Sequence, residues 1–436
     1  MPPPPSRVAV SAVSAADLST STTPGAGAHD APAPGPVRST LPARVDVAVV
    51  GGGCSGLSTA VRLARTAGDR SVLVLEGRSA PDPRSWCSWV DGSDPLPEAH
   101  SVSWDRWEVR TDSGTSIGTD PDHPYVLVRA TDRVAAATER FAVSGRVRIV
   151  AGAPVTAVAP DDRGGHDNHD VVVHSPVGTV LAGRVLDARG PRCPEDVAAD
   201  RVLLHQRFVG RWVTATRPVF DTTTVTLMDF SGEERGGPVR FVYVLPVTPT
   251  EALVESTLFT PDPADPFDHE DHVARYVRRR WGLEQDEWRV VDEERGCIPM
   301  TDAPATRDER WTAAEHVTGT TRPSSGYGFA RSNRHSAVVA RHLLDGTPVP
   351  PFTDPARTRF LDAVFLRFLR DRPEQAPAAF GRLFALPGPL VVRFLSERST
   401  PLDDLRIVLA LQKRPFLTAL VRTLADALVR RRRTRT

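Results

Sequence analysis

The hydrophobic pattern predicts that the folded chain begins with a strand, a glycine turn, a helix and a second strand. Residues 45–50 form a mostly apolar run, which is typical of a strand buried on both faces. Residues 57–67 carry apolar side chains at helical spacing, and residues 71–76 form another short apolar run. This order is that of a βαβ unit with parallel strands.

The pattern changes twice after this unit. The middle of the chain, roughly residues 100–300, has short β-rich runs separated by Pro, Gly and Asp. These runs are residues 171–174, 184–188, 241–245 and 253–257. After residue 335 the apolar positions follow helical spacing instead. The helical stripes are Phe360, Val364, Phe365, Phe368 and Leu369, then residues 390–395 and 402–411.

Two polar segments are predicted to lie outside the packed core. Residues 1–44 hold nine prolines with many Ala, Ser, Thr and Gly, a composition that buries too little apolar surface to offset the entropy of ordering. We expect a disordered Pro/Ala-rich tail there. Residues 161–170 (DDRGGHDNHD) offer His and Asp as metal ligands, yet their glycines and polarity favour a solvated hairpin loop. We therefore predict no metal site.

Charge and cysteine content narrow the choice of partners and compartment. Lys and Arg together number 54, as do Asp and Glu, so no net charge favours nucleic acid. The four cysteines are scattered singly, which fits free thiols in a reducing compartment. No run approaches the ~18 apolar residues that a spanning helix needs. We predict a cytoplasmic protein that binds no nucleic acid.

A dinucleotide-binding motif stands between the first predicted strand and helix. Gly51, Gly53 and Gly56 form G-x-G-x-x-G, and Glu76 ends the next predicted strand. The glycines permit, in turn, a tight turn, approach of a pyrophosphate and close helix packing, while the acid accepts from ribose hydroxyls. A turn without a ligand would not need the strand, helix and acid at these distances. The motif alone fits NAD or FAD, but its place at the start of the folded chain favours tightly held FAD.

Together these patterns predict an α/β fold in three parts. Residues 1–44 form the tail. Residues 45–335 form a Rossmann-type FAD-binding domain with an inserted, interleaved β-rich substrate layer. Residues 336–436 form a C-terminal helical region.

Further segments resemble the bacterial lycopene β-cyclases, a family of flavoproteins, and they occur in the order of that family. The segments are residues 84–89 (RSWCSW), 186–190 (LDARG), 205–210 (HQRFVG), 241–246 (FVYVLP), 253–257 (LVEST), 294–299 (ERGCIP) and 322–328 (RPSSGYG). The pair formed by residues 241–246 and 253–257 is the most diagnostic of them. The resemblance extends over roughly residues 45–424.

This resemblance implies a redox-neutral cyclisation of the ends of lycopene, or of a related polyene, to ionone rings, of the β type. A terminal double bond is protonated, a nearby double bond attacks the cation, and loss of a proton fixes the ring double bond. The implied enzyme is an isomerase (intramolecular lyase) of carotenoid biosynthesis. The resemblance also implies reduced FAD as the cofactor, with NAD(P)H as the electron source. Reduced FAD would supply a fixed negative charge that stabilises a cation in an apolar site.

Glu255 is the candidate catalytic acid, since burial in an apolar pocket raises the pKa of a carboxyl group. The alternative is an acid that ends an edge strand and pairs with an arginine. Arg84, Gly326 and Tyr327 are candidates for cofactor binding near the isoalloxazine, although such residues also serve as core or surface partners. The family commonly has an acid where this chain has Ser256, which leaves the ring type and the exact polyene open.

The C-terminal segment predicts contact with a membrane surface, which a membrane-dissolved polyene requires. Residues 416–429 are amphipathic, and Arg430 to Arg433 with Arg435 make a basic tail suited to anionic headgroups. The alternative is a bundle helix with a solvated tail. We expect peripheral binding at the inner face of the cell membrane, with other carotenoid enzymes as partners.

Two other classes of function remain open. One is an FAD-dependent monooxygenase or polyprenyl reductase of the same fold. Hydroxylases of this fold usually carry a Gly-Asp motif late in the chain, whereas residues 319–323 read GTTRP here. The other is a non-catalytic flavin- or carotenoid-binding protein, which the serine beside Glu255 permits.

Overall fold

The computed structural model describes residues 41–433, apart from residues 82, 162–169, 191–196, 199, 235, 305–313 and 318. The first 40 residues of the predicted tail and most of the predicted loop at 161–170 lie outside the described residues. The strands beside that loop, β9 (Ala157–Pro160) and β10 (Val171–Ser175), pair with each other in antiparallel fashion.

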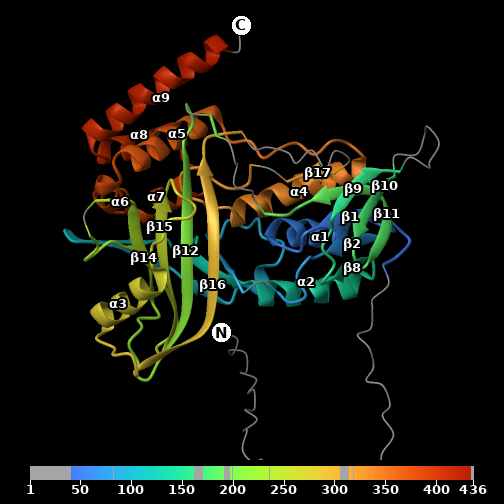
Figure 1. The fold of residues 1–436 in the computed structure, drawn as a ribbon, viewed down its shortest axis with the longest axis horizontal. Coiled ribbons are helices and arrows are strands. Elements are labelled where there is room, and N and C mark those ends of the chain that lie inside the picture. Colours follow the sequence, from blue (N-terminus) through green and yellow to red (C-terminus); the bar gives the residue numbers. More distant parts are fainter. Residues whose placement is uncertain are drawn as a thin grey trace, which may run out of the picture. The chain divides into compact units, whose positions relative to one another are not determined.

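A mixed sheet holds the predicted βαβ unit (Figure 1). Its strands follow the order β8 (Val147–Val150), β2 (Val72–Leu75), β1 (Arg44–Val50), β11 (Gly178–Asp187), β10 and β9, and β17 (Glu315–His316) pairs with β11. β1 has parallel neighbours on both sides. Alternate side chains of β1 and β2 enter two separate hydrophobic cores. This explains why both strands are apolar at nearly every position.

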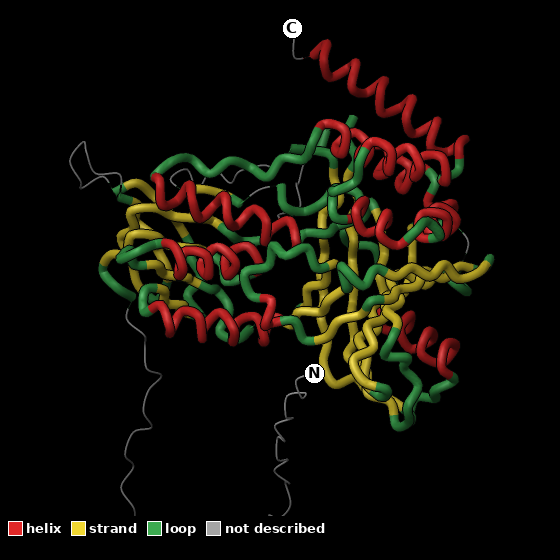
Figure 2. Tube along the Cα trace, turned by 180° about the vertical axis from the view of Figure 1, so that it is seen from behind, coloured by secondary structure: helices red, strands yellow, loops and turns green. Residues whose placement is uncertain are grey.

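Three helices cover one face of this sheet. α1 (Cys54–Thr66) follows the glycine turn and packs against α2 (Ala130–Ser144) and α4 (Phe329–Asp345). Figures 1 and 2 show the three helices side by side over the strands. α4 begins before the predicted helical region at residue 336 and returns to the N-terminal sheet.

The second sheet has seven strands and faces a different core. Its order is β16 (Trp288–Thr301), β12 (Leu203–Ala215), β15 (Glu251–Thr260), β14 (Val239–Thr248), β13 (Thr224–Asp229), β5 (Arg106–Thr111) and β6 (Gly114–Thr119). All pairs are antiparallel except the pair of β13 with β5. α3 (His269–Trp281) packs against β15 and β12. Asp268 caps the start of α3 by accepting from two backbone amides, and Gly282 ends it in the left-handed conformation.

A small third sheet contains the segment of residues 84–89. Its strands follow the order β3 (Ser85–Trp89), β7 (Tyr125–Arg129) and β4 (Val102–Trp104), and a short 3₁₀ turn, η1 (Pro97–Ala99), precedes β4. Tyr125, Trp89 and Trp104 are buried in the same core as the inner face of the second sheet. The third sheet therefore shares one hydrophobic core with the second.

The C-terminal region is helical, as predicted. It comprises α5 (Ala356–Asp371), η3 (Pro373–Gln375), α6 (Ala376–Phe384), α7 (Gly388–Leu395), α8 (Pro401–Ala410) and α9 (Lys413–Arg433). Side chains of α5, α6 and α7 join the core of the second sheet. Within the described ranges, we find no helix with the length and apolarity to cross a bilayer.

The predicted fold class is confirmed: a Rossmann-type α/β unit, a β-rich layer and C-terminal helices. The predicted β-rich runs fall within strands, except that residue 188 follows the end of β11, and these strands are longer than the runs. Residues 253–257, for example, are the centre of the ten-residue β15. Long antiparallel partners extend such strands beyond the local apolar pattern.

Candidate active site

The space around the Cβ position differs among the three motif glycines. Gly51 has a positive φ of 101°, and a Cβ there would lie 3.2 Å from the backbone N of Arg189. A Cβ at Gly56 would lie 1.9 Å from the carbonyl oxygen of Gly51. Apart from the adjoining residues of the chain, no described atom lies within 4 Å of the Cβ position at Gly53. The first and third glycines thus close the turn, and the second leaves open space in front of it.

Glu76 is attached to this turn through backbone amides. Its Oε2 accepts a hydrogen bond from the N–H of Gly52 at 2.7 Å, and its Oε1 accepts from the N–H of Arg78 at 2.9 Å. Gly53 is the N-cap of α1, and no side chain of the described residues caps this helix start. The turn therefore offers uncapped amides and an acid close together, the arrangement that binds a pyrophosphate and a ribose.

A row of four residues crosses the inner face of the second sheet. Strand register places Gly210 of β12 opposite both Glu294 of β16 and Glu255 of β15, and Glu255 lies opposite Tyr243 of β14. Directly opposed residues on neighbouring strands share one face of a sheet. Two carboxylates therefore stand on either side of a glycine.

Glu255 is the predicted acid, and it lies in the middle of an interior strand. β15 has β12 on one side and β14 on the other, so the predicted alternative of an acid ending an edge strand is wrong. Burial raises the pKa of Glu255 to about 7, although the hydroxyl of Thr257 donates to Oε1 at 2.7 Å and opposes this rise. A carboxyl group with such a pKa is protonated in a large fraction of molecules at neutral pH and can donate a proton.

Glu294 is a site residue that the sequence did not single out. Its side chain is 3% exposed, and its Oε2 accepts from the N–H of Ser85 at 2.5 Å. A Cβ at Gly210 would lie 3.0 Å from Cγ of Glu294. The side chain thus leans over Gly210 toward the centre of the row. In the sequence it stood only as the first residue of the family-like segment 294–299, and without the strand register it has no assigned face.

Aromatic side chains connect Tyr327 to this row. The ring of Trp89 makes edge-to-face contacts with Tyr125 at 4.8 Å and Tyr327 at 5.8 Å between centroids. The hydroxyls of Tyr125 and Tyr243 lie 3.0 Å apart. Burial raises the pKa of Tyr327 to about 12. The phenol stays neutral, and the aromatic faces beside the acid are suited to a cationic intermediate.

Residues around Arg84 and Gly326 reach the same region. Arg84 precedes β3 directly and is followed by Ser85, whose amide binds Glu294. Gly326 has a φ of 70°, and a Cβ there would lie 2.4 Å from Oε1 of Gln206. That buried oxygen has no hydrogen-bond partner in the described structure. An unpaired buried acceptor beside Gly326 is the kind of group that a bound cofactor satisfies.

Ser256 lies on the opposite face of β15, under α3. It is fully buried, and its hydroxyl lies 2.8 Å from Nδ1 of both His269 and His272. Nε2 of His272 in turn lies 2.8 Å from Glu233. The departure from the family pattern at Ser256 therefore belongs to a buried network that does not share a face with Glu255.

The chain matches a known protein family over most of its length. A family model described as "Lycopene cyclase protein" matches residues 46–421. The chain belongs to the lycopene cyclase family. Its relatives include lycopene beta-cyclases from Paracoccus sp. (27% identity; 55% of this chain and 64% of the relative) and Pantoea ananas (25%; 86% and 97%). Another is the chloroplastic lycopene beta cyclase of Nicotiana tabacum (24%; 69% and 60%).

The chain spans less than two thirds of the Paracoccus and tobacco proteins and nearly all of the Pantoea protein. Solved structures similar to this lycopene cyclase family member share its fold at low identity. A geranylgeranyl bacteriochlorophyll reductase-like protein from Thermoplasma acidophilum has a TM-score of 0.56 at 15% identity, covering 85% of this chain and 97% of the other. A flavoprotein/dehydrogenase from Cytophaga hutchinsonii has a TM-score of 0.52 at 14% identity (88% and 100%).

In this lycopene cyclase family member, the predicted site residues fall into two groups. Gly51, Gly53, Gly56 and Glu76 lie together at the glycine turn. The second group gathers around the inner sheet face and comprises Glu255, Arg84, Gly326 and Tyr327. Among the described residues, no cluster of His, Cys, Asp and Glu has the arrangement of a metal site.

Proposed function

We propose that this protein cyclises the ends of lycopene, or of a related polyene, to β-ionone rings without net oxidation, as an isomerase (intramolecular lyase). The observation that carries this proposal is Glu255, a carboxyl group with a pKa of about 7 beside an aromatic cluster. Membership of the lycopene cyclase family and the names of the relatives support the choice of reaction and ring.

The proposed cofactor is FAD in its reduced form, with NAD(P)H as the electron source. The open space at Gly53 and the uncapped start of α1 fit its pyrophosphate, and Glu76 fits its ribose. Gly326, Tyr327 and Arg84 would border its ring system. When bound, reduced FAD supplies a fixed negative charge near a developing cation in a site of low dielectric.

The chain's own residues perform the proton transfers in this proposal. Glu255 donates a proton to the terminal double bond, and a neighbouring double bond attacks the tertiary cation to close the ring. Glu294, on the other side of Gly210, accepts the proton that leaves the ring, so the mass of the polyene is unchanged. The faces of Trp89 and Tyr327 stabilise the cation between these steps. Exchange with water restores both carboxyl groups.

The substrate is membrane-dissolved, so we place the enzyme at the inner face of the cell membrane, beside other enzymes of carotenoid synthesis. Its catalytic residues do not depend on this placement. Activity on detergent-dispersed substrate therefore tests the chemistry separately from the location.

The deciding experiment adds anaerobically reduced FAD and lycopene in liposomes to the purified protein and resolves the products by chromatography with mass detection. A product of unchanged mass and new retention is expected. A gain of oxygen would identify a monooxygenase, and a gain of hydrogen a reductase. Bound flavin without any product would point to a carotenoid-binding protein. Each of these three outcomes overturns the proposal.

A further inference from the structure

α8 buries acidic side chains and exposes most of its large apolar ones. Asp403 and Asp404 are buried, where they form ion pairs with Arg393 and Arg357. Most of the large apolar residues of the helix point outward, and Ile407 is the one that is buried. Its exposed side chains include Leu402 (57% exposed), Leu405 (52%), Val408 (49%) and Leu409 (61%). A solvated helix normally shows the opposite arrangement.

α9 also carries large apolar residues on its outer side. Ala419 and Thr423 are its buried residues, and Phe416 stacks on Phe368 of α5 at 4.2 Å between ring centroids. Its outer stripe consists of Leu417, Val421, Leu424 and Leu428, with Val429 beside them. Among the described residues, sixteen large apolar side chains are exposed, and nine of them belong to α8 and α9. Such concentration marks an interaction surface rather than the scatter of ordinary apolar residues.

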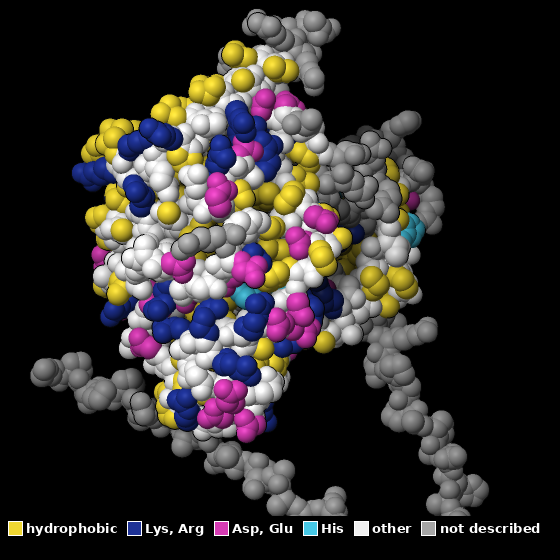
Figure 3. Space-filling view, turned by 60° about the vertical axis from the view of Figure 1, so that its left-hand side comes forward, with side chains coloured by type: hydrophobic (Ala, Val, Ile, Leu, Met, Phe, Trp, Pro, Cys, Tyr) yellow, Lys and Arg dark blue, Asp and Glu magenta, His cyan; other side chains and the backbone are white. Residues whose placement is uncertain are grey.

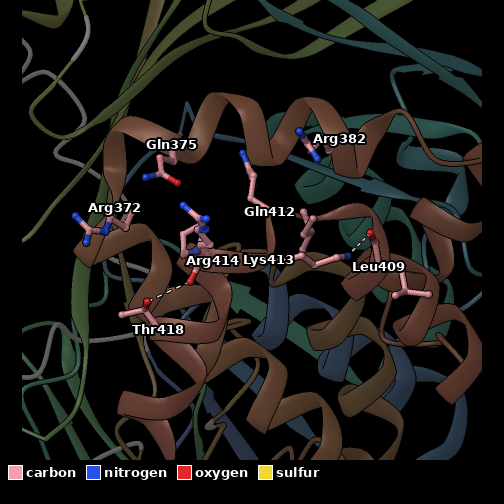
Figure 4. A pocket seen from close by; sticks show the side chains of 10 residues that line it. Arg372, Gln375, Arg382, Leu409, Gln412, Lys413, Arg414 and Thr418 are labelled. Atoms are coloured by element: carbon pink, nitrogen blue, oxygen red, sulfur yellow. Dashed lines mark hydrogen bonds between the residues drawn. The ribbon is translucent and has the colours of Figure 1, made fainter.

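A basic cavity of about 550 Å³ lies where α8 meets α9 (Figure 4). Four of its ten lining residues are cations, namely Arg372, Arg382, Lys413 and Arg414, and none is an acid. Nζ of Lys413 donates to the carbonyl oxygens of Val408 and Leu409, which fixes this cation at the end of α8. In Figure 3, basic side chains lie among apolar ones over the upper part of the molecule.

Apolar side chains next to clustered cations match one kind of partner in particular. An amphipathic helix at a bilayer buries its apolar face at the acyl boundary, while Lys and Arg contact anionic headgroups. A second copy of this chain would bring a second set of four cations to the same place without acids to neutralise them. Charge complementarity therefore favours an anionic lipid surface over a dimer.

We propose that α8, α9 and the basic cavity form a docking surface for an anionic phospholipid bilayer, with a lipid phosphate in the cavity. This deepens the proposed function, on which it rests for its purpose, because it identifies where the site would receive a membrane-dissolved polyene. α7 packs against α8 of this surface. The end of α7 lines a small cavity together with Trp89 and Tyr327.

The test is flotation of the flavin-loaded protein with vesicles that contain no carotenoid. Vesicles of phosphatidylcholine with phosphatidylglycerol should carry the protein, and vesicles of phosphatidylcholine alone should carry much less. Replacing two cavity cations, R382Q/R414Q, should weaken binding about fivefold for each cation removed. Replacing two outer residues, L417S/V421S, should weaken binding at least tenfold.

Matched controls come from exposed residues elsewhere. V290S/V291S removes two exposed valines of β16, and R275Q removes an exposed arginine of α3. Neither control should change flotation. Equal losses in the controls, or equal binding to both vesicle types, would overturn the proposal. So would binding of inorganic phosphate in the cavity without flotation, or loss of a dimer rather than of flotation in L417S/V421S.

Activity on detergent-dispersed lycopene separates this inference from the proposed function. A docking variant that no longer floats should still cyclise lycopene in detergent. A protein that floats but forms no product would leave the docking surface standing and remove the proposed reaction.

Discussion

Ser256 and Glu255 are neighbours in β15, but they lie on opposite faces of the strand and have different surroundings. Ser256 is fully buried, and its hydroxyl lies at hydrogen-bonding distance from His269 and His272. Glu255 is partly buried, and among the described residues its carboxylate accepts a hydrogen bond from Thr257 alone. Burial raises its pKa to about 7. Successive side chains of a strand point to opposite faces, so neighbours in sequence occupy different environments.

The difference separates a structural role from a chemical one. The buried Ser256 hydroxyl, within hydrogen-bonding distance of two histidines of α3, holds that helix against the sheet. An acid with a displaced pKa beside an open face is available to exchange a proton. The serine that departs from the family pattern thus has a structural role, and the retained glutamate has the properties that the proposed acid needs.

Replacing Glu255 with Gln should have the largest effect on turnover. A general acid contributes roughly 10²- to 10⁴-fold to rate, so kcat should fall by that factor while flavin binding and melting temperature are retained. Glu251 lies on the same face of β15 and pairs with Arg129, so Glu251→Gln is the matched control and should keep its activity. Comparable turnover in the two variants would remove Glu255 from the mechanism.

Placing a methyl group between the two carboxylates should have the next effect. In Gly210→Ala the new Cβ would lie 3.0 Å from Cγ of Glu294, so that side chain must shift. Displacement of a reacting group by about 1 Å costs up to about 100-fold, and we expect at least a tenfold loss of kcat. In Gly381→Ala the Cβ makes an ordinary 3.4 Å contact with Thr111, and activity should persist. Unchanged turnover in Gly210→Ala would argue against a role for Glu294.

The pH profile of kcat should report Glu255 directly. The protonated acid predominates below its pKa of about 7, so activity should fall as pH rises above that value, by roughly tenfold per unit. In the unfolded chain the same pKa is near 4.5. Between these values the folded protein holds the extra proton, so the free energy of unfolding should decrease as pH rises through this window. Both dependences should weaken in Glu255→Gln.

Replacing Ser256 with Ala should have the smallest effect on turnover and a clear effect on stability. His269 and His272 would each lose a buried hydrogen-bond partner. The free energy of unfolding should fall by about 1–3 kcal/mol, measured by chemical denaturation, while kcat stays within twofold at temperatures where the protein is folded. A large loss of kcat without loss of stability would contradict the separation of the two faces.

Local patterns predicted the parts of the site that are local in sequence. The glycine turn and Glu76 follow from one βαβ unit, and their geometry agrees with the motif. The position of Glu255 followed from the resemblance of residues 253–257. Glu294 was not predicted, because its face depends on the register of β16 with β12, which no local pattern specifies.

The C-terminal helices show a second limit of what the hydrophobic pattern predicts. The stripe at residues 402–411 correctly predicted a helix, but apolar periodicity does not say whether its face meets a core. In α8, Ile407 points inward, whereas Leu402, Leu405 and Leu409 point outward. Arg393 and Arg357 determine this orientation, because they hold Asp403 and Asp404 on the inner side.

The outward leucines of α8 and α9 also affect how the protein behaves in a test tube. In aqueous buffer without detergent, nine exposed apolar side chains on α8 and α9 should cause the protein to self-associate as its concentration increases. A mild nonionic detergent should suppress this association by coating the same side chains. The particle size seen in buffer would then reflect the solvent chosen by the experimenter more than any assembly formed in the cell.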